Sequence, residues 1–243
     1  MSVQHTARNR FGFGARPAIC VVACSIAVAF SAPVAGAPTR EPLEDFVRHA
    51  YFEGLPFDRL AEYSRSDVAR LYPLLASVSD RPYWVNVICA LGFLGDEATA
   101  DSLIAFLQFN AAGSITIEDY RARAAVPIAL GYLLNRTGSR KAKAFLMSHA
   151  DPSSWTGDDL RWTSPMHTSL AARDEHLSQM ALMGLAVSGD RDGGILLREY
   201  AAGTGPARMV VSRNREFLTE MVRQHEAVTA KGLTEYYRSQ RRR

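Results

Sequence analysis

The stretch from residue 83 to 109, YWVNVICALGFLGDEATADSLIAFLQF, most constrains what this chain can fold into. Its first half carries apolar residues three and four positions apart, which places them on one helical face. These residues are Trp84, Val87, Ile88, Leu91 and Leu94. Gly95-Asp96 then ends the pattern, and the spacing resumes from Ala100 to Leu107. A single helical hairpin of this size cannot bury its apolar faces alone, so we expect similar hairpins as neighbours.

Two further hairpins follow in the sequence. One pairs residues 122–133 with residues 142–146, and the other pairs residues 177–185 with residues 196–200. Before the first hairpin we expect three shorter helices, at 43–51, 56–63 and 66–78, with Pro73 kinking or shortening the last. After the third hairpin we expect one longer helix within 207–239 that caps the stack. No segment shows the alternation typical of a strand, so the sequence predicts an all-α fold in one domain, residues 38–243.

The segments ALGFLGD (90–96), ALGYLLN (129–135) and LMGLAVSGD (182–190) align on three glycines: Gly92, Gly131 and Gly184. The first two glycines are 39 residues apart, close to the length of HEAT and armadillo repeats. Residues 66–205 resemble HEAT repeats of the short bacterial kind, which implies a right-handed α-solenoid of helical hairpins. The second copy departs from the pattern, with Leu134-Asn135 in place of Gly-Asp. We interpret the glycines as structural repeat positions that let neighbouring helices approach closely.

The second interval between the glycines is longer, 53 residues, and residues 151–174 account for the excess as an insertion. Long loops on a rigid scaffold often carry function. This one contains Trp155 and Trp162, with the polar residues Asp158, Asp159 and Arg161 between them. One interpretation, which we favour, is that both tryptophans pack under the loop and fix it to the helices. The other is that these residues bind a peptide or an envelope glycan, with the indoles as stacking surfaces.

The sequence contains no recognisable reaction centre. The histidines beyond residue 37 are His49, His149, His167, His176 and His225, and none forms a pair spaced to seat zinc on one helical face. Cys89 lies within the apolar stretch, where a small core residue is the ordinary interpretation. No Gly-x-Ser-x-Gly elbow is present. We therefore expect no catalytic residues, no metal and no cofactor. The remaining enzymatic alternative is a hydrolase or lyase that uses His167 and nearby acids.

Residues 1–37 fit a secretory signal peptide: a basic start, the apolar run AICVVACSIAVAF and the small residues SAPVAGA. We expect cleavage and a secreted or periplasmic protein. An uncleaved N-terminal anchor and lipidation at Cys24 are the alternatives. Without the three arginines of this segment, the chain has 25 basic and 25 acidic residues, so no nucleic-acid partner is expected.

These features together predict a non-catalytic interaction scaffold of the bacterial cell envelope whose partner is another protein or a peptide. The alternative is a glycan- or peptide-binding module that uses the insertion. Residues 206–243 carry nine basic residues against four glutamates. The basic C-terminus, with Arg238 and the final three arginines, therefore permits a weak additional contact with a membrane surface.

Overall fold

The computed structural model describes residues 40–51, 54–109, 113–156, 160–204 and 215–241. By its contacts the chain divides into two units, Met1–Arg40 and Glu41–Arg243, and the elements below belong to the second. The predicted signal segment, residues 1–37, lies outside the described residues. The described part is mostly helical, which confirms the all-α prediction. No helix within it combines the length and the apolar character needed to cross a membrane.

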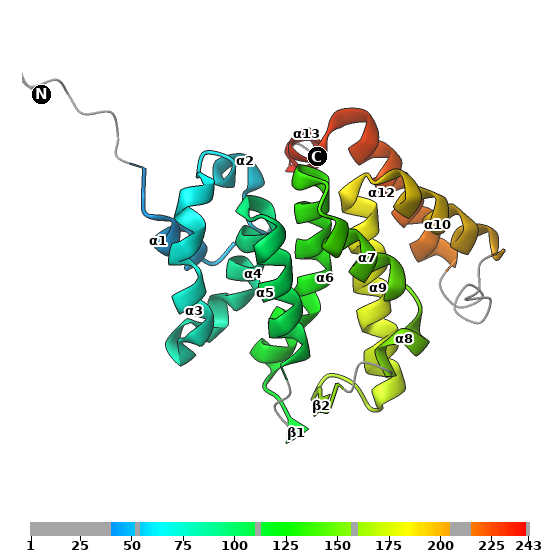
Figure 1. Cartoon of the computed structure of the whole chain (residues 1–243), viewed down its shortest axis with the longest axis horizontal. Coiled ribbons are helices and arrows are strands. Elements are labelled where there is room, and N and C mark those ends of the chain that lie inside the picture. The colour runs from blue at the N-terminus through cyan, green and yellow to red at the C-terminus, as the bar shows by residue number, and fades with distance from the viewer. Residues whose placement is uncertain (1–39, 52–53, 110–112, 157–159, 205–214, 242–243) are drawn as a thin grey trace, which may run out of the picture. The chain divides into compact units, whose positions relative to one another are not determined.

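Short helices begin the described part (Figure 1). They are α1 (Leu43–Val47), α2 (Phe57–Leu60), the 3₁₀ helix η1 (Arg65–Arg70), α3 (Tyr72–Ala76) and the 3₁₀ helix η2 (Val78–Tyr83). The helix predicted over 66–78 is thus divided between η1 and α3. Pro73 stands in the first turn of α3, where its missing N–H leaves no helical hydrogen bond unmade.

The three predicted hairpins are confirmed. They are α4 (Trp84–Leu94) with α5 (Glu97–Gln108), α6 (Ile117–Thr137) with α7 (Arg140–Ser148), and α9 (Leu170–Ser188) with α10 (Arg191–Ala202). The second helix of each hairpin starts at a polar N-cap. Asp96, Ser139 and Asp190 each accept a hydrogen bond from a backbone amide in the first turn.

Helix α6 lies between α4 and α9, and these three helices form one row (Figure 1). Helices α5, α7 and α10 form a second row, in which α7 contacts both of the others. Each hairpin therefore buries its apolar faces against the next one, as its length requires. The core lies mainly between the two rows.

The predicted repeat glycines lie where the helices of the first row touch. A Cβ atom on Gly92 would come within 3.0 Å of the carbonyl group of Ala129 on α6. A Cβ on Gly131 would come equally close to the carbonyl of Gly184 on α9, and one on Gly184 to the carbonyl of Pro127 on α6. The absence of a side chain at these positions is what lets the backbones approach.

The described part of the insertion contains two short elements. It contains α8 (Pro152–Thr156) and β2 (Trp162–Thr163), and β2 pairs in parallel with β1 (Gly113–Ser114). Two-residue strands are too short to show alternation, so the sequence did not predict them. Helix α9 begins at Leu170, so the last residues of the predicted insertion belong to this helix.

From residue 215 to 241 the C-terminal part forms two helices, α12 (Arg215–Lys231) and α13 (Leu233–Arg241), instead of one. The chain turns at Gly232, whose φ of 78° lies in the left-handed region that favours glycine. Helix α12 packs on α9 and α10, whereas α13 contacts α2. Residues 207–214 of the predicted capping helix lie outside the described residues.

The close contact at Gly92 makes a testable prediction. The Gly92→Val variant should lower the free energy of unfolding by about 1–3 kcal/mol, because its side chain would collide with the backbone of α6. Ala98→Val is the matched control, since it places the same side chain on an exposed position of a helix. Urea unfolding followed by circular dichroism measures both. Equal stability of the two variants would show that α4 and α6 do not touch at Gly92.

Candidate binding site

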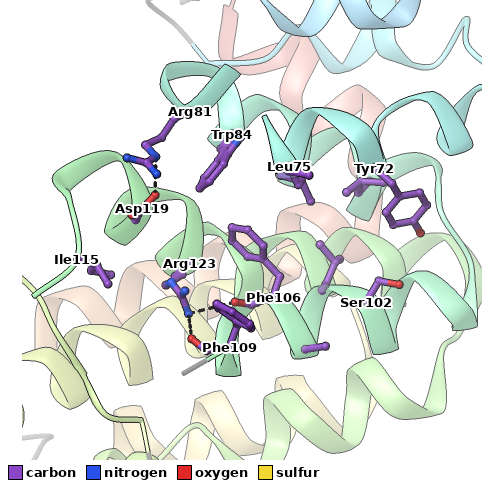
Figure 2. Close-up of a pocket in the computed structure, with 14 residues that line it drawn as sticks. Tyr72, Leu75, Arg81, Trp84, Ser102, Phe106, Phe109, Ile115, Asp119 and Arg123 are labelled. Atoms are coloured by element: carbon purple, nitrogen blue, oxygen red, sulfur yellow. Dashed lines mark hydrogen bonds and ion pairs between the residues drawn. The ribbon is translucent and has the colours of Figure 1, made fainter. Parts of the chain in front are cut away.

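A pocket of about 590 Å³ opens between α3 and η2 on one side and α5 and the start of α6 on the other (Figure 2). Its volume is typical of sites that hold a drug-sized molecule or a few side chains. Most of its lining is apolar or aromatic. The residues are Tyr72, Leu75, Ala76, Arg81, Trp84, Leu91, Ser102, Leu103, Ala105, Phe106, Phe109, Ile115, Asp119 and Arg123. We call this cavity the α5 pocket.

Two aromatic residues shape the α5 pocket. The indole of Trp84, the first residue of α4, donates a hydrogen bond of 2.8 Å to the carbonyl of Leu74. Its ring meets the ring of Phe106 edge-on, with the centroids 5.7 Å apart. Phe109 follows the end of α5 and its side chain remains 67% exposed. A large apolar side chain that is left open beside an apolar pocket is typical of a binding surface.

Arg123 of α6 supports the end of the pocket near Phe109. Its side chain is buried, and Nη1 donates hydrogen bonds to the carbonyl oxygens of Phe106, Leu107 and Phe109 at 3.1, 2.8 and 2.8 Å. These carbonyls lie at the C-terminal end of α5, where they lack helical partners and favour a positive charge. Burial lowers the pKa of Arg123, and Asp119 opposes this effect. The guanidinium nevertheless remains charged at neutral pH.

A second arginine lies at the edge of the α5 pocket. Nε of Arg81 is 3.0 Å from Oδ1 of Asp119, and its guanidinium lies over the ring of Trp84 at 5.4 Å. The Nε–H group does not point along the line to the oxygen, so the contact is an ion pair without a hydrogen bond at these atoms. The pair places opposite charges side by side at the rim of an apolar cavity, as Figure 2 shows.

The predicted ligand-binding tryptophans are fully buried and lie against different parts of the molecule. Trp155 packs on His149 and Phe145, and its Nε1 donates to the carbonyl of His149 at 3.0 Å. Trp162 donates to the carbonyl of Leu107 at 3.3 Å. Neither indole offers a free face for a sugar or a peptide, and the interpretation that they fix the insertion is the one that agrees with this geometry.

The other predicted site residues are only partly placed by the structure. Asp158 and Asp159 lie outside the described residues, and Arg161 is exposed. His167 is half-buried and contacts Tyr120 and His176. The structure therefore does not assemble the predicted constellation as a single site within its described part.

A second cavity, of about 580 Å³, contains Cys89 together with Tyr132, Tyr236 and Tyr237. The hydroxyls of Tyr132 and Tyr237 are hydrogen-bonded at 2.8 Å. Burial raises the pKa of the Cys89 thiol to about 12, so the thiol is protonated at neutral pH and is a poor nucleophile. Among the described residues, no group of three or more His, Cys, Asp or Glu side chains is placed to hold a metal ion.

Sequence reasoning missed the α5 pocket, although a signal for it was present. Phe106 and Phe109 are apolar, but they fall outside the apolar stripe of α5 that begins at Ala100. Trp84 and Arg123 cover the ring of Phe106, whereas Phe109 stays exposed. The contribution of Arg123 itself had no signal, because the carbonyls that it binds are found only in the folded chain.

Arg123 is expected to be essential for stability. Arg123→Met should lower the free energy of unfolding by about 2–4 kcal/mol, since three buried or half-buried carbonyls lose their donor. Arg121→Met, an exposed change on the same helix, should shift it by no more than about 0.5 kcal/mol. Urea unfolding of both variants tests this expectation. If Arg123→Met were as stable as Arg121→Met, Arg123 would not hold the end of α5.

The chain was also compared with known proteins. No family model, no curated protein and no solved structure matches it. The likeness to HEAT repeats therefore remains a prediction from the sequence.

Proposed function

We propose that this protein is a non-catalytic binding protein of the bacterial cell envelope, and that it holds an apolar segment of another protein or peptide in the α5 pocket. The observation that carries the proposal is the open, largely apolar cavity of about 590 Å³ with the exposed side chain of Phe109 at its border. Hot spots of protein interfaces are commonly aromatic or aliphatic side chains inserted into such pockets.

The distribution of exposed apolar residues supports this proposal. In the described part, five of the six large apolar side chains that remain exposed lie in or beside segments that join helices. They are Val78, Phe109, Ile117, Met166 and Leu170. The pairing of β1 with β2 and the ion pair of Arg81 with Asp119 place these segments at one end of the helices, where α6 and α9 begin. Apolar residues gathered at one end of a protein favour contact with a partner.

The arrangement of the helices supports a scaffold role. We propose that the three hairpins form a right-handed solenoid of HEAT-like repeats, with α12 as its cap. Two rows of helices in contact along the array, and glycines at the contacts of the first row, agree with such repeats. Solenoids present extended surfaces on which partners bind without any chemical step.

Export to the envelope is proposed on the sequence of residues 1–37. A contact of the basic C-terminus with anionic lipid is a weaker proposal, because Arg238 is already paired with Glu235 at 2.7 Å. The burial of Trp155 and Trp162 leaves no observation that favours a glycan site in the insertion.

A blocking substitution tests the proposed function. Ala105 is exposed and lines the α5 pocket, so Ala105→Trp should fill the cavity without disturbing the core. We expect peptides selected from a random library to contain a large apolar residue. Ala105→Trp should weaken their binding by about tenfold or more, as loss of a hot spot does. Isothermal titration calorimetry provides the measurement.

Ala230→Trp is the matched control, because Ala230 is an exposed alanine on α12 that does not line the pocket. It should leave the affinity unchanged. Equal binding by the two variants would place the peptide elsewhere. Failure to select any peptide, together with turnover of a substrate in activity screens, would replace the proposal with an enzymatic one.

A further inference from the structure

Two histidines meet at one buried tyrosine near the α5 pocket. The hydroxyl of Tyr120 on α6 is hydrogen-bonded to Nδ1 of His176 on α9 and lies 3.4 Å from Nε2 of His167 in the insertion. The two imidazole rings are 5.1 Å apart. Nδ1 of His167 in turn lies 3.4 Å from the hydroxyl of Ser164. The hydrogen bonds of this cluster join the start of α6 to the segment 164–176, which is distant from it in sequence.

The cluster can take up one proton without losing a hydrogen bond. With both histidines neutral, the Tyr120 hydroxyl donates to one imidazole nitrogen and its oxygen accepts from the other. If His176 becomes protonated, its Nδ1–H donates to the tyrosine oxygen and the hydroxyl turns to donate to His167. A second proton makes this arrangement of hydrogen bonds impossible, because both imidazoles are then donors toward the tyrosine oxygen. The hydroxyl hydrogen of Tyr120 would have no acceptor, and two positive charges would lie about 5 Å apart.

The other charged groups near the cluster also oppose protonation. Burial lowers the pKa of both histidines, and a neighbouring charge adds to this effect: Arg173 for His167, and His167 for His176. Arg173 is itself bound to Asp174 of α9, at 2.7 Å from Nη2 to Oδ1, so the negative charge of Asp174 is already shared. From α6 the cluster meets only the neutral Tyr120 among the contacts that the described residues make.

The cluster is linked to the α5 pocket by direct contacts. The ring of Tyr120 meets the edge of Trp162, with the centroids 6.0 Å apart, and Trp162 lies against the guanidinium of Arg123 at 5.4 Å. Arg123 holds the carbonyl of Phe109 at the border of the pocket. In addition, the amide of Ile115, another lining residue, donates to the carbonyl of Thr163 at 3.1 Å. The segment 160–169 therefore supports one wall of the pocket.

We propose that His167, His176 and Tyr120 form a pH-sensitive latch, which holds the segment 160–169 against the wall of the α5 pocket at neutral pH and releases it on acidification. The consequence for ligand binding rests on the proposed function of that pocket, whereas the release of the segment does not. Acidification would loosen the wall that Arg123 and Ile115 form and so weaken the hold on an apolar ligand. Pairs of histidines commonly act as such switches between about pH 5 and 7.

The direction of the effect follows from the lowered pKa values. Below the ordinary histidine pKa of 6.5, the opened segment binds more protons than the latched one. The stability of the latch is therefore fully present above that value and decreases as the pH falls through the window below it. The two histidines interact, so the transition belongs to the pair and not to either residue alone.

Hydrogen exchange detected by mass spectrometry tests the latch. After correction for the intrinsic rate, amides of 160–169 should exchange at least roughly threefold faster at about pH 5 than at about pH 7.5, and those of α4 should not change. The gain should be smaller in His176→Gln, because the single remaining histidine accepts its proton without that conflict and only the lowered pKa of His167 still acts. The full gain in exchange rate should persist in the control variant His49→Gln, because His49 is an exposed histidine that pairs with Glu41 and lies outside the cluster. An equal gain in wild type and His176→Gln, or no gain in the wild type, would overturn the proposal.

The link to the pocket needs a second measurement. The fluorescence of N-phenyl-1-naphthylamine, a probe that stays uncharged at both pH values, should report binding to the wild type and not to Ala105→Trp. Its Kd should rise at least roughly threefold at about pH 5 in the wild type and in His49→Gln, but less in His176→Gln. If the probe bound the wild type and Ala105→Trp equally, the proposed function of the pocket would fail while the exchange result still decided the latch. A pH-independent Kd in the wild type would overturn the link.

Discussion

The backbones of α4, α6 and α9 touch directly at three glycines, and the arrangement of the other helices depends on these contacts. The axes of helices that pack through ordinary side chains lie about 8–10 Å apart. A glycine at the contact has no side chain to keep the two backbones apart. The close row leaves α5, α7 and α10 to cover it from one side. A glycine in the interior of a helix costs about 1 kcal/mol of stability relative to alanine. The packing between the two helices must therefore contribute more than that.

The polar side chains that support the α5 pocket and form the histidine cluster lie at the end of this row where α6 begins. Arg123 and Tyr120, one turn apart on α6, both contact Trp162. The arginine binds the end of α5, and the tyrosine binds His167, which precedes α9, and His176 within α9. One turn of helix thus connects the wall of the pocket with the two histidines through contacts with a single indole.

The hairpins were predictable from the sequence because each follows from local information: the apolar period, the break at its turn and the polar N-cap. The division of 66–78 into η1 and α3 was only partly predictable. Pro73 marked an interruption, but its position in the first turn depends on where η1 ends. The pocket could not be predicted, because Arg123, Trp84 and Phe106 come together only when three helices are placed. Likewise, the sequence placed His167 and His176 near each other without showing that Tyr120, 47 residues before His167, lies between them.

The return of α13 to α2 has a mechanical consequence. In an array of hairpins in which each contacts only its neighbours, a pull applied to the two ends would peel one hairpin at a time. Here the ring of Tyr237 on α13 lies 4.6 Å from that of Phe57 on α2, and its hydroxyl binds Tyr132 in the middle of the row. A force that pulls the two ends apart would act first on the contacts of Tyr237 with Phe57 and Tyr132. These contacts must break before the hairpins bear the force. The contact of α13 with α2 therefore ties the last described helix to one of the first, so that they resist tension jointly.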